Sequence, residues 1–549
     1  MPVITIDVDD LMMLVGGEVT IEQVKNALPL NKIEIEEWND KEAKVEITHD
    51  RLDLLSVEGI ARQIRSWLGI NTGLIKYSVA EPRVVLRASK VALRPYIVCG
   101  TVRGIKMDDR LVRSLMQLQE AIDLTIGRDR SKVAIGVHDL SKVESPFYYK
   151  ETGLDDIRFV PLGFSKEMSI REIIREHPKG IEYAHLVRAK RVPIIVDRNG
   201  DVLSFPPIIN GELTKVTENT RDIFFDITGT DFAAINYALN ILTTALYERG
   251  GRIEGVKIEG AIKDIFPQLE PEIRDIKIDE IDEVIGVGIK REEIKSLLER
   301  MGYGVMEIGK DSMKVLIPPY RADILHNIDI IEDVAIAYGY NDIKSVLPKI
   351  PTSGGEESEK ERITNIIRDV MVGLGFQEVV NFTLTSKEKQ TTMVNIKDNK
   401  LIELENPISR EYNVCRKTLF PLLLETLSHN KHRRFPQKIF EIGDCIIYDE
   451  SSDVATRNVR KIAATISHSK ANLAEIISIV NAFSSSLGLR ITLKNCEMKT
   501  FIKGRCALIY KGNNLIGFLG EIHPEVLERF ELEKPVTIFE IDAEEAGLW

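Results

Sequence analysis

A polar segment at residues 351–361, PTSGGEESEKE, does most to limit how this chain can fold. Its small, polar and charged residues are typical of a linker between domains. A proline-containing stretch, FPQLEPEIR from Phe266, is interpreted as a second connector. At roughly 100–200 residues per domain, the 549 residues should divide into about three to five units. The predicted domains are residues 1–75, 79–265, 271–348 and 358–549.

Apolar periodicity predicts a multidomain α+β fold. Residues 1–75 should form a small α/β domain, with strands near 3–8 and 45–48 and helices near 21–27 and 55–68. An Asn-Gly pair between VPIIVD and VLSF, at residues 198–201, predicts a hairpin. Further on, helices are expected at 289–301 and 327–338 around a strand at 313–317. The last region should alternate helices and strands, including a strand at 378–384.

Charge, cysteines and missing motifs exclude several functional classes. The 73 Lys and Arg against 85 Asp and Glu, net −12, argue against indiscriminate polyanion binding, so any RNA contact must be local. The densest basic stretches are LVRAKR from Leu186 and SHNKHRRFPQK from Ser428. Five scattered cysteines show no zinc or disulfide spacing, and no P-loop, GxSxG or HExxH occurs. An acidic start and no apolar run of about 18 residues predict a cytoplasmic protein that does not enter the membrane.

Four acids gather in the segment PPYRADILHNIDIIEDVAIAYGY: Asp323, Asp329, Glu332 and Asp333. In a helix starting near Asn327, the last three are i, i+3 and i+4 neighbours, with Asp323 returning from the preceding loop. Four carboxylates suit a hard cation such as Mg²⁺. The alternative is that Asn327 caps the helix and the acids stabilise its amino-terminal dipole without a metal.

Several long segments together resemble the beta-subunit family of phenylalanine–tRNA ligase, in its archaeal and eukaryotic form. They are HDRLDLLSVEGIAR from His49, GRDRSKVAIGVHDL from Gly127, SFPPIINGELTKVTENTRDIFFDITGTD from Ser204, IPPYRADILHNIDIIEDVAIAYGY from Ile317, NPISREYNVCRKTLFPLLLETLSHN from Asn406, KIFEIGDC from Lys438 and GEIHPEVL from Gly520. The resemblance implies an amino-terminal α/β domain, a tRNA-editing domain, a winged-helix-like domain and a class II synthetase-like antiparallel core.

The same resemblance implies a ligase of two alpha and two beta chains that joins phenylalanine to tRNA(Phe) with ATP. It also implies a Mg²⁺ ion shared with the alpha subunit at the acidic cluster. A class II active site needs an arginine in the pattern FRxE, whereas the matching strand here reads KIFE and places Ile439 at that position. An uncharged side chain cannot donate to a phosphate. We therefore expect ATP and phenylalanine to bind in the alpha subunit and this core to serve as an interface and scaffold.

A second, hydrolytic activity follows from the weak rejection of tyrosine by a phenylalanine pocket, which discriminates against an added hydroxyl by only about a hundredfold. In the segment from Ser204 to Asp231, we expect Ser204 and Asn210 to position the ester or a water, and Asp226 or Glu212 to accept the phenol proton. No Ser–His or Cys–His pair is evident, so a positioned water is expected instead of a covalent intermediate. His138 and His49 are interpreted as hydrogen-bonded structural residues.

Three alternatives remain at this point. The chain could be a free-standing editing hydrolase of mischarged tRNA, a metal-dependent phosphohydrolase built on the acidic cluster, or a structural scaffold subunit whose editing site is inactive.

Overall fold

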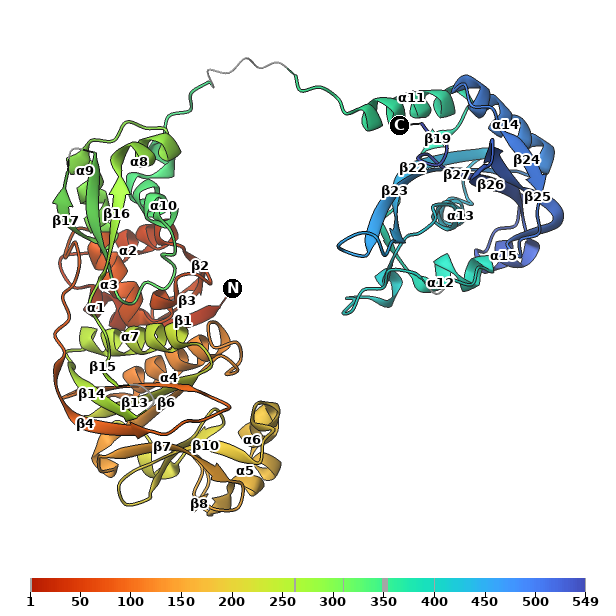
Figure 1. The fold of residues 1–549 in the computed structure, drawn as a ribbon. Helices are drawn as coiled ribbons and strands as arrows, with labels where there is room; N and C mark the ends of the chain where they lie inside the picture. Colours follow the sequence, from red (N-terminus) through yellow and green to blue (C-terminus); the bar gives the residue numbers. More distant parts are fainter. Residues whose placement is uncertain (1, 261–262, 310, 348–353, 399, 549) are drawn as a thin grey trace. The chain divides into compact units, whose positions relative to one another are not determined.

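The computed structural model describes residues 2–260, 263–309, 311–347, 354–398 and 400–548. The chain folds as two compact units, Met1–Leu347 and Pro348–Trp549 (Figure 1). The first part of the predicted linker, residues 351–353, lies outside the described residues. None of the helices in the described ranges is long and apolar enough to cross a membrane.

The first unit begins with a three-stranded antiparallel sheet in the order β1-β3-β2, packed against helices. Its elements are β1 (Val3–Asp7), α1 (Val8–Val15), α2 (Ile21–Ala27), β2 (Ile33–Trp38), β3 (Glu42–Ile47) and α3 (Val57–Trp67). The predicted strands and helices are confirmed, and α1 and β2 are additions. In β2, IEIEEW, Ile33 is buried and the three glutamates are more exposed, because one face packs on the core and the other meets solvent. The two consecutive glutamates lie at a shift in register between Ile35 and Glu37.

A ten-stranded mixed sheet follows, in the order β12-β11-β10-β7-β4-β14-β5-β13-β6, with β15 beside β14. The strands are β4 (Ala80–Ala88), β5 (Tyr96–Arg103), β6 (Val133–Asp139), β7 (Phe147–Gly153), β10 (Arg191–Val196), β11 (Val202–Phe205), β12 (Ile209–Asn210), β13 (Ile223–Gly229), β14 (Arg252–Gly260) and β15 (Asp264–Phe266). The hairpin predicted at the Asn-Gly pair is confirmed by the pairing of β10 with β11, and Gly200 has a φ of 92°.

Two long helices cover one side of this sheet, and two short helices lie near β10. Helices α4 (Asp109–Leu124) and α7 (Phe232–Glu248) contact each other and the strands β6, β5 and β13 (Figure 1). The short helices α5 (Ile170–Glu176) and α6 (Pro178–Tyr183) lie near β10 (Figure 1).

The first unit ends with a small antiparallel sheet in the order β16-β18-β17 and three helices. Its elements are β16 (Glu272–Lys277), α8 (Ile278–Ile285), α9 (Arg291–Arg300), β17 (Gly304–Ile308), β18 (Ser312–Ile317) and α10 (Asn327–Tyr338). The predicted helices and the strand in this region are confirmed. Helix α9 contacts α3, so the two ends of the first unit pack together.

The second unit is a seven-stranded, mostly antiparallel sheet in the order β19-β22-β23-β27-β26-β25-β24. The strands are β19 (Gln377–Glu378), β22 (Gln437–Tyr448), β23 (Thr456–Ser467), β24 (Thr492–Asn495), β25 (Phe501–Lys511), β26 (Asn514–Ile522) and β27 (Val536–Asp542). One face packs on α11 (Glu359–Gly373) and α14 (Leu473–Ser486), and the other on α13 (Phe420–His429) and α15 (Pro524–Arg529).

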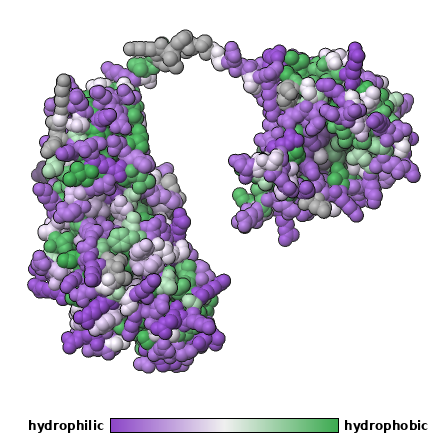
Figure 2. All heavy atoms as spheres, viewed as in Figure 1, coloured by the Kyte–Doolittle hydropathy of each residue, from purple (hydrophilic) through white to green (hydrophobic). Residues whose placement is uncertain are grey.

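The strand predicted at residues 378–384 is only partly present. Strand β19 stops at Glu378, and a separate two-residue strand, β20 (Leu384–Thr385), pairs with β21 (Val414–Cys415). Between them, Val380 is 87% exposed and Phe382 is 75% exposed. Val380 and Phe382 therefore present their apolar side chains to solvent at this edge of the sheet. Figure 2 shows that apolar residues also reach the surface of this unit among a mainly hydrophilic exterior.

A buried charge cluster joins the amino-terminal domain to the large sheet. Arg249, which follows α7, donates to both carboxylate oxygens of Asp10 at 2.6 Å and to Glu58 at 2.7 Å. Asp10 and Glu58 come from α1 and α3 and are almost completely buried. Removing one member of such a cluster leaves an uncompensated charge away from water.

We expect Arg249→Met to lower the free energy of unfolding by about 3–5 kcal/mol, because it leaves two buried carboxylates without their cation. Urea denaturation followed by circular dichroism measures the change. The control is Arg113→Met, which removes an exposed partner of Asp109 and should change stability by less than about 1 kcal/mol. Equal losses in the two variants would contradict the role of burial.

Candidate functional site

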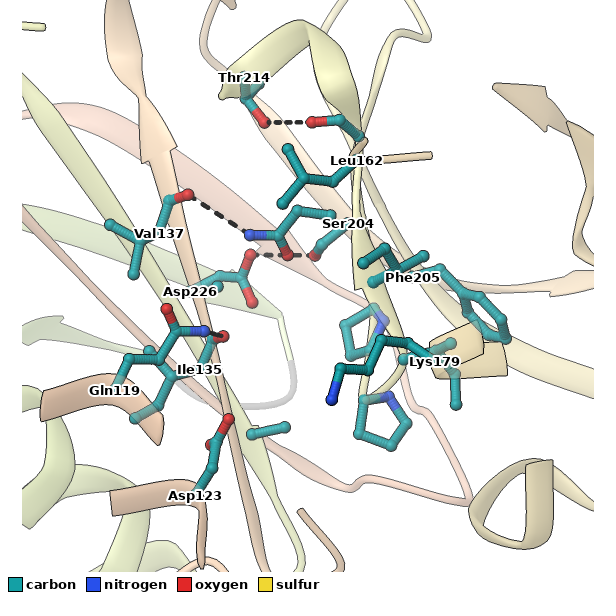
Figure 3. A pocket seen from close by; sticks show the side chains of 18 of the residues that line it. Gln119, Asp123, Ile135, Val137, Leu162, Lys179, Ser204, Phe205, Thr214 and Asp226 are labelled. Atoms are coloured by element: carbon teal, nitrogen blue, oxygen red, sulfur yellow. Dashed lines mark hydrogen bonds between the residues drawn. The ribbon is translucent and has the colours of Figure 1, made fainter. Parts of the chain in front are cut away.

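A cavity of about 460 Å³ lies where the two ends of the large sheet approach each other. Strands β11 and β12 stand at one end of the strand order, and β6 and β13 at the other. Two hydrogen bonds cross the seam: Ser204 Oγ donates to Asp226 Oδ2 at 3.0 Å, and Asn210 Nδ2 donates to the Val137 carbonyl at 3.4 Å (Figure 3). The curled sheet thus brings together three residues that the sequence predicted as one site.

Asp226 is the centre of the polar wall. It is almost fully buried on β13, and its Oδ2 is 2.6 Å from His138 Nε2 as well as 3.0 Å from Ser204 Oγ. The other ring nitrogen of His138 is 2.8 Å from Thr214 Oγ1. A buried carboxylate needs such partners because desolvation is costly. The expectation that His138 is a hydrogen-bonded residue is confirmed.

This arrangement differs from a nucleophilic triad. Ser204 donates to the Asp226 carboxylate, and the two ring nitrogens of His138 are bound to Asp226 and Thr214, so the imidazole is not placed against the Ser204 hydroxyl. The geometry instead offers a carboxylate and a hydroxyl to a polar ligand inside the cavity. Such a wall can bind a hydroxyl group or hold a water molecule.

Glu212 does not belong to the wall. Its Oε2 accepts from the Gly163 backbone N–H at 2.7 Å, and its Oε1 lies 3.3 Å from Lys215 Nζ. The residues that line the cavity include its neighbours Gly211 and Thr214 but not Glu212 itself. Glu212 therefore braces the loop at Gly163, and the structure brings together only three of the four residues predicted for this site.

Several lining residues were missed by the sequence reasoning. Figure 3 shows Gln119 and Asp123 from α4 and Lys179 from α6 beside the predicted residues. Gln119 Nε2 donates to the Ile135 carbonyl at 2.8 Å. Burial raises the pKa of Asp123 to about 7, although Arg130 and Arg94 act in the opposite direction. One feature of the sequence indicated that Asp123 is buried: it follows two apolar residues in a helix otherwise rich in polar side chains.

The acidic cluster is organised by protein partners. Arg321 donates to Asp323 at 2.8 and 2.7 Å and to Asp333 at 2.6 Å, and all three side chains are buried. Tyr303 Oη also donates to Asp333 at 2.6 Å. Burial alone would raise the pKa of Asp323, but Arg321 outweighs it and the pKa is about 2. These two acids therefore form a buried ion-pair network.

The other two acids point to different partners. Asp329 Oδ2 accepts from the backbone N–H groups of Leu325 and His326 at 2.8 and 2.7 Å, and Glu332 pairs with Lys32 at 3.1 Å. The helix cap is His326, one residue before the predicted Asn327. Across the part of the chain that the structure describes, no three His, Cys, Asp or Glu side chains are grouped to hold a metal. The four predicted ligands do not fit one Mg²⁺ ion in this arrangement, because their carboxylates bond to separate protein partners.

The second unit offers no cation at the position of the class II arginine. Ile439 is buried with Leu423, Leu427 and other apolar residues beneath α13. Nearby, Arg416 is itself buried and bonded to Glu441 at 2.5 Å and to the Asp444 carbonyl at 2.9 Å. Both side chains are thus committed to the interior of the domain.

Comparison with known proteins agrees with this architecture. Family models match three successive parts of the chain: the B3/4 domain at residues 105–261, the tRNA synthetase B5 domain at 274–340 and the phenylalanyl tRNA synthetase beta chain CLM domain at 343–543. These domains define a multidomain subunit of the aminoacyl-tRNA synthetase class.

The beta subunits of phenylalanine–tRNA ligase from Methanocaldococcus jannaschii and Archaeoglobus fulgidus are 44% and 42% identical to this chain. The alignments cover 99% of this chain and 100% and 98% of those proteins. An amino-terminal fragment of the beta subunit from Pyrococcus horikoshii matches 62% of this chain and all of that chain, with 40% identity and a TM-score of 0.59. The chain belongs to the phenylalanine–tRNA ligase beta-subunit family.

We expect magnesium to leave the stability of the isolated chain unchanged, because all four acids of the cluster already have protein partners. Thermal unfolding should give the same midpoint, within about 1 °C, in EDTA and in excess MgCl₂, since only a ligand that binds the native state raises it. CaCl₂ at equal ionic strength is the control for general salt effects. A rise of several degrees specific to Mg²⁺ would contradict this expectation.

Proposed function

We propose that this chain is the beta subunit of a cytoplasmic phenylalanine–tRNA ligase of two alpha and two beta chains, and that its cavity hydrolyses mischarged tyrosyl-tRNA. The alpha subunit binds ATP, phenylalanine and the acceptor end of tRNA(Phe) during aminoacylation. The observation that carries the editing proposal is the buried Asp226–Ser204 pair that faces the cavity.

Selectivity follows from the polarity of the wall. A tyrosine side chain brings a phenol hydroxyl that can form further hydrogen bonds with Asp226 and Ser204, whereas phenylalanine has no group that can form them. A hydrogen bond to a charged group contributes about 1.5–3 kcal/mol. The remaining lining is largely apolar, including Phe205, Ile208 and Val112, and suits an aromatic ring. The site therefore favours the amino acid that the synthetic site fails to reject.

Hydrolysis requires a water directed at the ester carbon. Asn210 on β12 and Gln119 on α4 both line the cavity, and their amides can hold a water or the ester carbonyl. Since both ring nitrogens of His138 are bound to Asp226 and Thr214, no imidazole serves the Ser204 hydroxyl, and a positioned water fits the arrangement better than an acyl-serine. Because Glu212 lies outside the cavity lining, Asp226 alone is proposed to accept the phenol proton.

We expect Ser204→Ala and Asn210→Ala each to slow tyrosyl-tRNA hydrolysis by at least tenfold, which is about 1.4 kcal/mol of transition-state stabilisation. Phenylalanine attachment by the complex should keep its wild-type rate. The assay follows labelled tyrosyl-tRNA with purified complex, and Asn219→Ala, an exposed asparagine on the following loop, is the matched control. Unchanged clearance by both cavity variants would refute the assignment.

The partner surface lies at the incomplete edge strand of the second unit. Val380 and Phe382 are exposed there, Phe382 packs edge-on against Tyr412 at 6.1 Å between ring centroids, and Ile408 is fully exposed nearby. Exposed apolar residues beside an open strand edge are typical of a surface that another chain covers. This surface favours a subunit over a free-standing editing hydrolase.

We expect Phe382→Asp to prevent assembly with the alpha chain, because it places a charge at the centre of this apolar surface. Native mass spectrometry of the co-expressed chains should show two alpha and two beta copies for the wild type and separate chains for the variant. Val454→Asp, at an exposed apolar residue on the β22–β23 turn, is the control. Full assembly of F382D would exclude this surface.

A further inference from the structure

Asp123 is a buried acid on the cavity wall that the proposed hydrolysis does not use. It lies in the last turn of α4, is 3% exposed and lines the cavity. Figure 3 shows it on the same helix as Gln119, one turn further along. Its Oδ1 is buried without a hydrogen-bond partner among the described residues. An ionisable group in that situation calls for an explanation, since burial without a full set of partners is costly.

The neighbour of Asp123 is Arg130, at the end of an unusual loop. Arg128, Asp129 and Arg130 have φ angles of 46°, 53° and 62°, in the left-handed region that side-chain-bearing residues avoid. Each such residue costs about 1–3 kcal/mol and persists only where surrounding contacts hold it. Here the Arg130 backbone N–H donates to the Asp123 carbonyl at 3.2 Å, and Arg94 donates to the Arg130 carbonyl at 3.0 Å.

The loop places the Arg130 guanidinium between the Asp123 carboxylate and the backbone carbonyls of a turn. Its Nε lies 3.4 Å from Asp123 Oδ2, and its Nη1 donates to the carbonyls of Pro207 and Ile208 at 3.3 and 3.0 Å. Those carbonyls belong to the turn that connects Ser204 on β11 with Asn210 on β12. Arg130 therefore ties the end of α4 to the segment that carries both side chains of the proposed site.

The charges around Asp123 oppose one another. Arg130 and Arg94 favour its ionised form, while burial and Glu120, on the same helix, favour the protonated form. Burial is the largest of these effects and raises the pKa to about 7. The charge of Asp123, and with it the strength of the contact to Arg130, therefore changes near pH 7.

We propose that Asp123 is a positioning residue whose ionised form anchors Arg130 and thereby holds the Pro207–Ile208 turn, with Ser204 and Asn210, in the geometry that hydrolyses the ester. Protonation removes the anion that fixes the Arg130 side chain, and the turn loses its tie to α4. The inference rests on the proposed editing function and adds proton control to it.

The same group has the opposite effect on stability. The native carboxyl takes up its proton at a pKa of about 7, against an ordinary value of 3.8. Between these values the native state holds more protons than the unfolded state, so the free energy of unfolding falls as pH rises. Ionised Asp123 therefore serves the site while it destabilises the fold. A residue that only supported the fold would affect activity and stability in the same direction.

The test compares wild type and Asp123→Asn in the assembled complex between pH 5.5 and 8.5. Rates of tyrosyl-tRNA hydrolysis are corrected for uncatalysed hydrolysis at each pH. The wild-type rate should fall about tenfold per pH unit below pH 7, as expected for one essential ionisation. At pH 8, D123N should be at least tenfold slower, with a flat profile and an unfolding midpoint equal to or above that of wild type. Asp109→Asn, at the exposed start of the same helix, should match the wild type in both.

The contrary outcomes are distinguishable. If D123N keeps the wild-type rate and pH profile, the inference is overturned and the proposed function stands. If D123N loses activity and also unfolds more easily at pH 8, Asp123 is only structural and the inference fails. If wild-type complex does not clear tyrosyl-tRNA at any pH, the proposed function itself fails, and this inference with it. Should D123N not fold, Arg130→Gln removes the other half of the tie to the Pro207–Ile208 turn, and a wild-type rate and pH profile in R130Q would overturn the proposal.

Discussion

The buried carboxylate of Asp226 is the constraint on which the first unit depends. A charge taken out of water must find donors, and the two that serve it come from β6 and β11, near opposite ends of the strand order. Strand β6 is the direct neighbour of β13, whereas Ser204 on β11 reaches Asp226 because the sheet curls until its ends meet. Gly136 makes room for this contact, because a Cβ there would stand 2.4 Å from Asp226 Oδ2. The cavity is the space that remains beside the closed seam.

The sequence predicted much of the local structure and part of the site. Apolar periodicity located helices such as α3, and the Asn-Gly pair located the β10–β11 hairpin, because both signals depend on neighbouring residues. The polar residues of the segment that resembles an editing domain predicted one site of Ser204, Asn210, Glu212 and Asp226, of which all but Glu212 line the cavity. Asp123 and Arg130 were missed because they approach Pro207 only after the sheet has curled, across about eighty residues of sequence.

The acidic segment shows the limit of pattern reading. Spacing placed its carboxylates on one helical face, but spacing does not reveal whether a side chain points to solvent or to the interior. Arg321 lies two residues before Asp323 in the same segment, and its guanidinium donates hydrogen bonds to Asp323 and Asp333. The strand expected at 378–384 is interrupted because the main chain of Asn381 bonds to the side chains of Glu441 and Arg416 and not to the backbone of β22.

That interrupted strand also bears on how copies of this chain can meet one another. Exposed apolar residues at a sheet edge are a hazard for pairing with other unpaired strands. Wherever this edge is uncovered, Val380 and Phe382 of one copy are open to the same residues of another. Any surface that buries them therefore also protects the chain from self-association.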